Sequence, residues 1–271
     1  MINKNTLNDL RKIIYRNSDL LRKNKTRLSN FLQPINKILY GGGNRVLSIK
    51  YDNNKYDFLE SHDDNYFILY SKNEEDCVTV VINDKIAEIH GIGNYESCLI
   101  DTNVNVGSTL LKITIKMLKK YKDRFNIDKI ILTDNSIKKC GNKNIILSTM
   151  LILLTGNTWY GKYGFRPYDD IKDKLNKRMN IKYDHNQNIM ETITITEANI
   201  VKYIELTKKE RIIEDVKKLI SLHPNMLLTD FINQFIKDYD KTCKYFELFY
   251  EDLFDGLGLT SFYKQSFVLF I

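Results

Sequence analysis

The segment Asn105-Val106-Gly107-Ser108 has the residue types and the position to bind a phosphate, because it joins a polar loop to an apolar-periodic stretch. A loop that turns into a helix presents unpaired backbone N–H groups and the positive end of the helix dipole, which suit a phosphate or pyrophosphate. Asn105 and Gly107 tolerate the positive φ angles that point successive amides inward, and Ser108 offers a hydroxyl. Taken alone, a single glycine before a helix is most often part of an ordinary helix start.

A carboxylate and an imidazole lie two residues apart at Glu88 and His90, on a stretch that alternates in polarity. Alternation along a strand places both side chains on one face, where they could line a cleft. Apolar neighbours would raise the pKa of Glu88, as a general base working near neutrality requires. The alternative, which the pattern slightly favours, is a solvent-facing pair on a half-exposed strand.

Short strands and one long helix must position these residues. Strands are expected at 45–51, 66–70, 77–82, 85–91 and 129–133, and a run at 97–100 is expected to continue the fourth strand. Leucine and isoleucine recur at helical spacing over 107–120, which predicts an amphipathic helix there. Strands in succession, followed by strand, loop, helix and strand, predict a meander that leads into a βαβ unit.

The remaining segments are expected to be mainly helical. Helices are predicted before the glycine triplet at 41–43, over the apolar run 145–154, and near 198–222 and 226–254. Further strands are predicted at 189–196 and within 261–271.

Composition excludes wholesale disorder and a membrane-embedded bundle, because 43% of the 271 residues are hydrophobic and 28% are charged. The apolar run 145–154 is too short to span the roughly 30 Å of a bilayer core. The four cysteines lie far apart and the four histidines show no ligand spacing, so no metal site is expected. With sparse cysteines and no signal peptide, we expect free thiols in an intracellular, reducing compartment such as the cytoplasm.

The net charge of +7 is unevenly distributed along the chain. Residues 1–45 hold ten Lys and Arg against two Asp, so this segment carries +8 and the rest of the chain about −1. The favoured interpretation is a solvated helix surface, and a nucleic-acid footprint ranks last because no groove-recognition pattern accompanies the basic residues.

The loop at 105–108, the strand K-I-I-L-T and the stretch W-Y-G-K-Y-G-F-R-P at 159–167 together resemble the GNAT superfamily of acyl-CoA-dependent N-acetyltransferases. Tyr160, Lys162, Gly164 and Phe165 fit the Tyr-x-Lys-x-Gly-Phe element of that family. Its loop pattern, Q/R-x-x-G-x-G/A, fits less closely because Thr102 stands where Gln or Arg is usual.

The resemblance implies a cofactor, acetyl-CoA or another acyl-CoA, whose pyrophosphate lies on the amides of Asn105, Val106, Gly107 and Ser108. It also implies that a splayed strand near Leu99 and Ile100 pairs with the pantetheine arm. Tyr160 would protonate the leaving thiolate. The alternative is that Tyr160 is only an aromatic residue of the core. Glu88 would take the proton of the acceptor amine, and the alternatives for this base are Glu96 and His90.

We therefore expect an α/β fold with a mixed, mostly antiparallel sheet of GNAT type. The expected division is a basic helical segment at 1–44, a core at 45–168, and a mostly helical extension at 169–271 that ends in a strand. The expected function is acetyl transfer to an amine by direct attack. The alternative is an inactive GNAT-like module whose helical extensions bind a protein partner or a second copy of the chain.

Overall fold

The computed structural model describes residues 45–51, 54–63, 66–70, 76–93, 98, 106–140, 143–169, 173–240 and 243–271. The expected helices at 1–44 lie outside these residues, as do Glu96, Leu99, Ile100 and Asn105. The strands are β1 (Arg45–Tyr51), β2 (Asn54–Asp63), β3 (Tyr66–Tyr70), β4 (Asp76–Asn83), β5 (Ile86–Ile92), β6 (Lys129–Thr133), β7 (Ile137–Cys140), β8 (Lys143–Ile146), β9 (Arg166–Tyr168) and β10 (Ser266–Phe270). The α-helices are α4 (Val106–Lys120), α5 (Lys122–Phe125), α6 (Leu147–Thr155), α7 (Asp173–Thr192), α8 (Ile200–Ile204), α9 (Glu210–Leu222), α10 (Leu228–Tyr239) and α11 (Tyr250–Gly256). The 3₁₀ helices are η2 (Gly161–Tyr163), η3 (Glu205–Thr207) and η4 (Phe246–Leu248).

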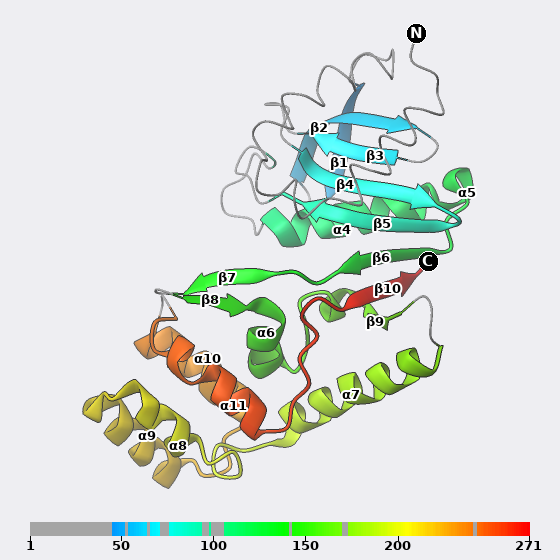
Figure 1. Ribbon diagram of the computed structural model, residues 1–271. Helices are drawn as coiled ribbons and strands as arrows, with labels where there is room; N and C mark the ends of the chain where they lie inside the picture. Colours follow the sequence, from blue (N-terminus) through cyan, green and yellow to red (C-terminus); the bar gives the residue numbers. More distant parts are fainter. Residues whose placement is uncertain are drawn as a thin grey trace.

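Eight of the described strands form one open sheet in the order β1-β2-β3-β4-β5-β6-β10-β9 (Figure 1). Neighbouring strands in this sheet are antiparallel, except for the parallel pair β5 and β6. Strands β1 to β5 therefore form a meander, as expected, and α4 provides the crossover to β6. Strand β2 was not among the predicted strands, because polar residues dominate its sequence. The predicted mixed, mostly antiparallel α/β sheet is confirmed at this level.

Helix α4 packs against β4 and β5. Its buried residues recur at helical spacing, and Leu110, Ile113 and Met117 are fully or almost fully removed from solvent. The buried hydroxyl of Thr114 donates to the carbonyl oxygen of Leu110 at 2.8 Å, which gives this buried polar group a hydrogen-bond partner. The amphipathic helix expected over 107–120 is thus confirmed, and it begins one residue earlier.

The short hairpin of β7 and β8 was not expected, because only two of the four residues in each strand are apolar. The helix expected over 145–154 begins only at Leu147, because Ile145 and Ile146 belong to β8. Helix α6 is apolar almost all round, and it contacts α7, α10 and α11. It ends at Gly156, whose φ of +70° suits glycine and whose N–H donates to the carbonyl oxygen of Ile152 at 2.8 Å.

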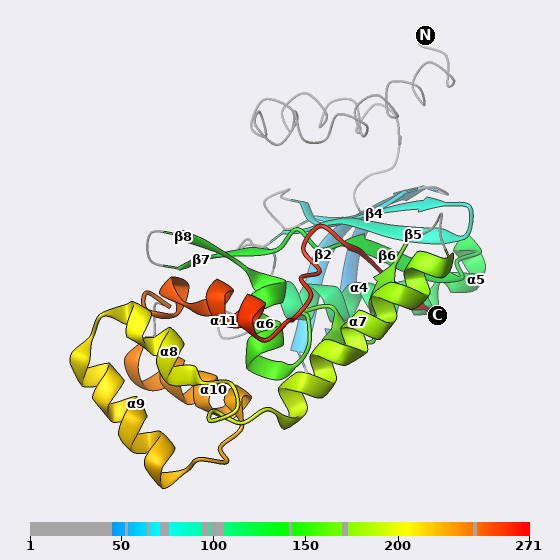
Figure 2. The same cartoon turned by 60° about the horizontal axis from the view of Figure 1, so that its bottom comes forward.

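The strand predicted over 189–196 is wrong, since the long helix α7 continues to Thr192. Ile189 and Met190 pack inward from this helix, and only an isolated bridge joins Thr194 to Leu227. The predicted helices further on are present as α8 to α11, which group away from β1 to β5 in both views (Figures 1 and 2). The closing strand is also confirmed, and β10 lies inside the sheet, between β6 and β9.

All four cysteines form disulfides, so the prediction of free thiols is wrong. Cys77 of β4 pairs with Cys98, and Cys140 of β7 pairs with Cys243, at Cα–Cα separations of 5.5 and 5.1 Å. The expectation of a reducing compartment loses its support, because disulfides persist mainly in oxidising environments. Among the described residues, no helix combines the length and the apolar character needed to cross a membrane.

Candidate functional site

The parallel strands β5 and β6 stop pairing before β5 ends. Their register runs from the pair Ile86 and Lys129 to the pair Ile89 and Leu132, whereas β5 continues to Ile92. On its other edge β5 stays paired with β4, but the register shifts so that His90 is an extra residue opposite the step from Thr79 to Val80. A bulge of this kind bends a strand and increases its twist, so it accounts for the end of the β5–β6 ladder.

The first turn of α4 follows β5 in the chain and lies against Trp159. The indole Nε1–H donates to Ser108 Oγ at 3.3 Å, and a Cβ atom added to Gly107 would lie 3.4 Å from the indole ring. No acidic side chain lies in this first turn. The structure thus brings Gly107 and Ser108 together with the aromatic stretch at 159–167, and the missing side chain at Gly107 permits that close approach.

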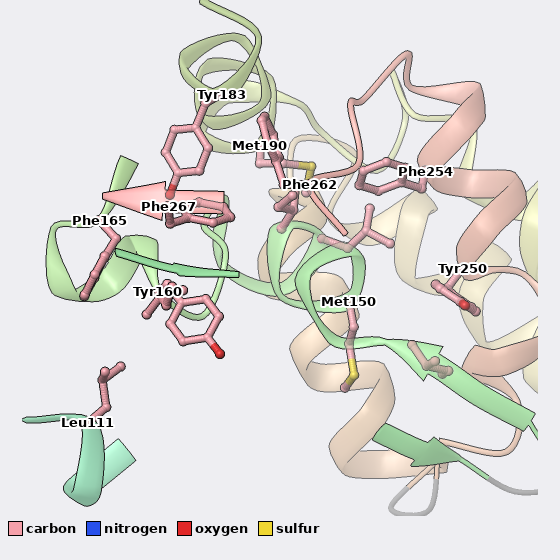
Figure 3. Close-up of a cluster of buried hydrophobic side chains, with 14 of the residues drawn as sticks. Leu111, Met150, Tyr160, Phe165, Tyr183, Met190, Tyr250, Phe254, Phe262 and Phe267 are labelled. Atoms are coloured by element: carbon pink, nitrogen blue, oxygen red, sulfur yellow. The ribbon is translucent and has the colours of Figure 1, made fainter. Parts of the chain in front are cut away.

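Tyr160 is a buried aromatic residue, 8% exposed, with a polar contact at its hydroxyl. Its ring centroid lies 4.9 Å from that of Trp159, 6.2 Å from Phe165 and 6.1 Å from Phe267. In Figure 3 the hydroxyl oxygen points away from Phe165 and Phe267. It lies 3.5 Å from the hydroxyl oxygen of Ser136, so the residue combines core packing with a polar end.

Burial raises the pKa of Tyr160 to about 12. The hydrogen bond with Ser136 acts in the opposite direction, and the charge of Asp134 adds to the increase. The phenol therefore holds its proton at neutral pH.

Asp134, directly after β6, was not singled out from the sequence, yet it is 0% exposed. Its Oδ1 accepts the backbone N–H of Ser136 at 3.0 Å. Its Oδ2 and the buried hydroxyl of Ser148 have no hydrogen-bond partner within the described residues. Burial raises the pKa of Asp134. The hydrogen bond from Ser136 and the nearby hydroxyl of Ser148 lower it, although the Ser148 hydroxyl is not in hydrogen-bond geometry. A polar residue immediately after an apolar strand next to a parallel neighbour was the signal that could have identified it.

Glu88 and His90 lie on the same face of β5, as expected from alternation. Glu88 Oε2 lies 3.4 Å from His90 Nε2, and the two side chains are 49% and 34% exposed. The expected increase in the pKa of Glu88 is wrong: the hydrogen bond with His90 lowers it, burial opposes that effect, and the charge of His90 adds to the decrease. The solvent-facing pair is therefore the interpretation that the structure supports.

The two proposed catalytic side chains lie in separate pairs. Tyr160 contacts Ser136, Glu88 contacts His90, and no hydrogen bond or ion pair joins Glu88 to Tyr160 in the part of the chain that the structure describes. In the same part, no group of three or more His, Cys, Asp or Glu residues is arranged to hold a metal ion. In three comparisons, no protein-family model, curated protein or solved structure matches the chain.

Proposed function

We propose that the protein is a GNAT-like N-acyltransferase that transfers an acetyl group from acetyl-CoA, or another acyl group from its CoA ester, to an amine. The observation that carries this proposal is the parallel pair β5 and β6, whose ladder ends at Ile89 and Leu132 in an otherwise antiparallel sheet. Ligands of α/β sheets bind at the carboxyl ends of such strands, next to the start of the crossover helix. Here that helix is α4.

The residues at this position suit coenzyme A. The amides of Val106, Gly107 and Ser108 open α4, and this turn contains no carboxylate that would repel a pyrophosphate. The part of β5 beyond Ile89 diverges from β6 and offers a strand-like partner for the amide groups of a pantetheine arm.

Direct attack assigns one proton transfer to each of two side chains. The amine nitrogen forms a bond to the acyl carbon, the carbon–sulfur bond breaks, and the electron pair stays on sulfur. Tyr160 then gives its phenol proton to the thiolate, for which its protonated state at neutral pH is required. Solvent returns a proton to the phenolate before the next turnover.

Glu88 accepts the proton that the amine loses. Its lowered pKa leaves it ionised at neutral pH, and its exposure suits transfer through a water molecule. His90, which contacts it, is the alternative base.

Acetyl-CoA binding and turnover test the proposal. We expect acetyl-CoA to raise the unfolding temperature in proportion to the logarithm of its concentration, since it binds only the folded state. With a panel of primary amines, we expect release of the CoA thiol, and a fall of roughly a hundredfold or more in kcat for Tyr160→Phe with the affinity for acetyl-CoA unchanged. A folded protein whose unfolding temperature does not respond to millimolar acetyl-CoA would contradict the proposal.

The second candidate function is an inactive GNAT-like module that binds a protein partner. The separation of Tyr160 and Glu88 into two pairs without a mutual hydrogen bond or ion pair in the described residues favours it. Binding of acetyl-CoA without release of its thiol for any amine would support this second function.

A further inference from the structure

Four polar side chains gather beside the end of β6, where three are buried and Ser136 is half-buried. Asp134 and Ser136 follow β6, Ser148 lies in the first turn of α6, and Tyr160 precedes η2. Asp134 and Ser148 are 0% exposed, and Asp134 Oδ2 and Ser148 Oγ keep unused hydrogen-bonding capacity. Buried polar groups are normally paired, so this cluster calls for an explanation beyond packing.

The backbone of this cluster is held from three sides. Asp134 N–H donates to the carbonyl oxygen of Gln265 at 3.0 Å, and its own carbonyl oxygen accepts from Lys264 N–H at 2.7 Å. Ser136 N–H donates to Asp134 Oδ1, and the carbonyl oxygen of Ser136 accepts from Leu147 N–H at 3.0 Å. The N–H and the carbonyl oxygen of Ser136 are therefore both hydrogen-bonded, which fixes the backbone that carries its hydroxyl.

We propose that Ser136 is the positioning residue of Tyr160, holding the phenol oxygen through a hydrogen bond while Asp134 holds Ser136. The proposal rests on the proposed acyltransferase, in which Tyr160 donates its proton to sulfur. For that step the Ser136 hydroxyl donates to the phenol oxygen, so that the phenol proton stays available.

The same hydrogen bond strengthens as the reaction proceeds. When the O–H bond of Tyr160 breaks and the S–H bond forms, the phenol oxygen becomes negative, and a bond from Ser136 to a charged oxygen is stronger than one to a neutral oxygen. The nearby carboxyl group of Asp134 opposes a lasting phenolate, which favours return of the proton.

Turnover measurements on matched variants test this role. Relative to wild type, we expect Ser136→Ala to lower kcat by roughly ten- to a hundredfold with the KM for acetyl-CoA unchanged, since a hydrogen bond to a developing charge is lost. Ser136→Thr should restore most of the rate. Ser148→Ala, which removes a more deeply buried hydroxyl without a bond to Tyr160, should keep the wild-type rate. In a Tyr160→Phe background, Ser136→Ala should have no further effect, and a full further loss there would overturn the proposal.

A second readout does not depend on catalysis. In protein labelled with ¹³C at tyrosine Cζ, the resonance of Tyr160, assigned with Tyr160→Phe, should move in Ser136→Ala and stay in place in Ser148→Ala. An unmoved resonance would overturn the positioning role, whether or not the protein binds acetyl-CoA. Absence of acetyl-CoA binding with a moved resonance would instead contradict the proposed function alone. If Ser136→Ala does not fold, Ser136→Cys supplies the same test, since a thiol is a weak donor of similar shape.

Discussion

Asp134 has a fully buried carboxyl group, and its ionisation bears on the stability of the fold. Its carboxyl group has one hydrogen bond from the Ser136 backbone and one oxygen without a partner within the described residues, and it is closed off from water. Burial of an incompletely paired carboxylate costs free energy, and the group responds with a raised pKa. Asp134 therefore makes the stability of the fold sensitive to pH.

Asp134→Asn should become more stable relative to wild type as the pH rises. Because the pKa of Asp134 is raised in the folded state, its stabilising contribution is complete below the unfolded pKa and is lost as pH rises through the folded pKa. As pH rises from below the unfolded pKa of about 3.9 through the higher folded pKa, we expect the variant to gain stability relative to wild type. Urea unfolding at several pH values measures this difference, and a difference that does not vary with pH would contradict the assignment.

Gly161 occupies a position where any side chain meets Tyr183. An added Cβ would collide with Tyr183 Oη and lie 2.8 Å from Asn157 Oδ1, and these two groups share a hydrogen bond of 2.6 Å. We expect Gly161→Ala to lower the free energy of unfolding by roughly 1–3 kcal/mol. Gly91→Ala is the control, because nothing lies within 4 Å of its added Cβ. Equal free energies of unfolding for the two variants would show that the Tyr183 side chain moves aside without loss of stability.

Residue types alone could identify Tyr160 and the Gly107-Ser108 turn, because each belongs to a local pattern. A polar residue directly after an apolar strand marks Asp134 as a candidate, but Ser136 belongs to no local pattern, since it joins the site only when β10 and α6 pack beside the end of β6. The prediction for the pKa of Glu88 was wrong because alternation gives the face of a strand but not the contacts made on it: the hydrogen bond with His90 outweighs burial.

At the scale of elements, the first turn of α4 supplies the backbone amides that are proposed to bind the cofactor. Its partial positive charge is not neutralised by any acidic side chain of that turn. A carboxylate placed there would stabilise the helix, but it would take the position in which the pyrophosphate of the cofactor is proposed to bind.

Ser108→Asp should therefore separate stability from binding. We expect a gain of about 0.3–1 kcal/mol in the free energy of unfolding, from the carboxylate at the helix N-terminus. We also expect a loss of roughly tenfold or more in affinity for acetyl-CoA, from repulsion of the pyrophosphate. Denaturant unfolding and acetyl-CoA titration measure the two effects, with Ser108→Ala as the uncharged control. Unchanged affinity in Ser108→Asp would place the pyrophosphate elsewhere.

Local patterns predicted α4, β6 and the meander strands other than β2. The pattern failed at α7, where Ile-Thr-Ile-Thr at 193–196 resembles a strand although the helix before it runs to Thr192. The Thr192 hydroxyl bonds the carbonyl oxygen of Asn188 at 2.9 Å, which lets a β-branched residue close the helix. The packing of Ile189 and Met190 against the core favours a helix over a strand at these residues.

At the scale of the whole molecule, two disulfides connect parts that the backbone leaves far apart. The bridge Cys77–Cys98 closes a separation of 21 residues, and Cys140–Cys243 closes one of 103. The second bridge ties the β7–β8 hairpin to the segment between α10 and η4. Their pairing could not be predicted from spacing, since four cysteines allow three connectivities.

Loop length predicts a different contribution from each bridge. Replacing both cysteines of Cys140–Cys243 with serine should cost about 4–5 kcal/mol in the free energy of unfolding, and replacing those of Cys77–Cys98 about 3 kcal/mol, because the longer loop restricts the unfolded chain more. Denaturant unfolding of the two double variants, with disulfide-bonded wild type as reference, checks the order. The reverse order would show that restriction of the unfolded chain is not the main effect.

The interior position of β10 has a consequence for synthesis on the ribosome. Strands β6 and β9 leave the ribosome long before Ser266–Phe270, and each then lacks the neighbour that lies between them in the finished sheet. Unpaired strand edges pair readily with other chains, so the nascent protein is most open to aggregation during this interval. Slow translation between β9 and β10 prolongs that exposure, and a holding chaperone bound there protects the chain until its last strand arrives.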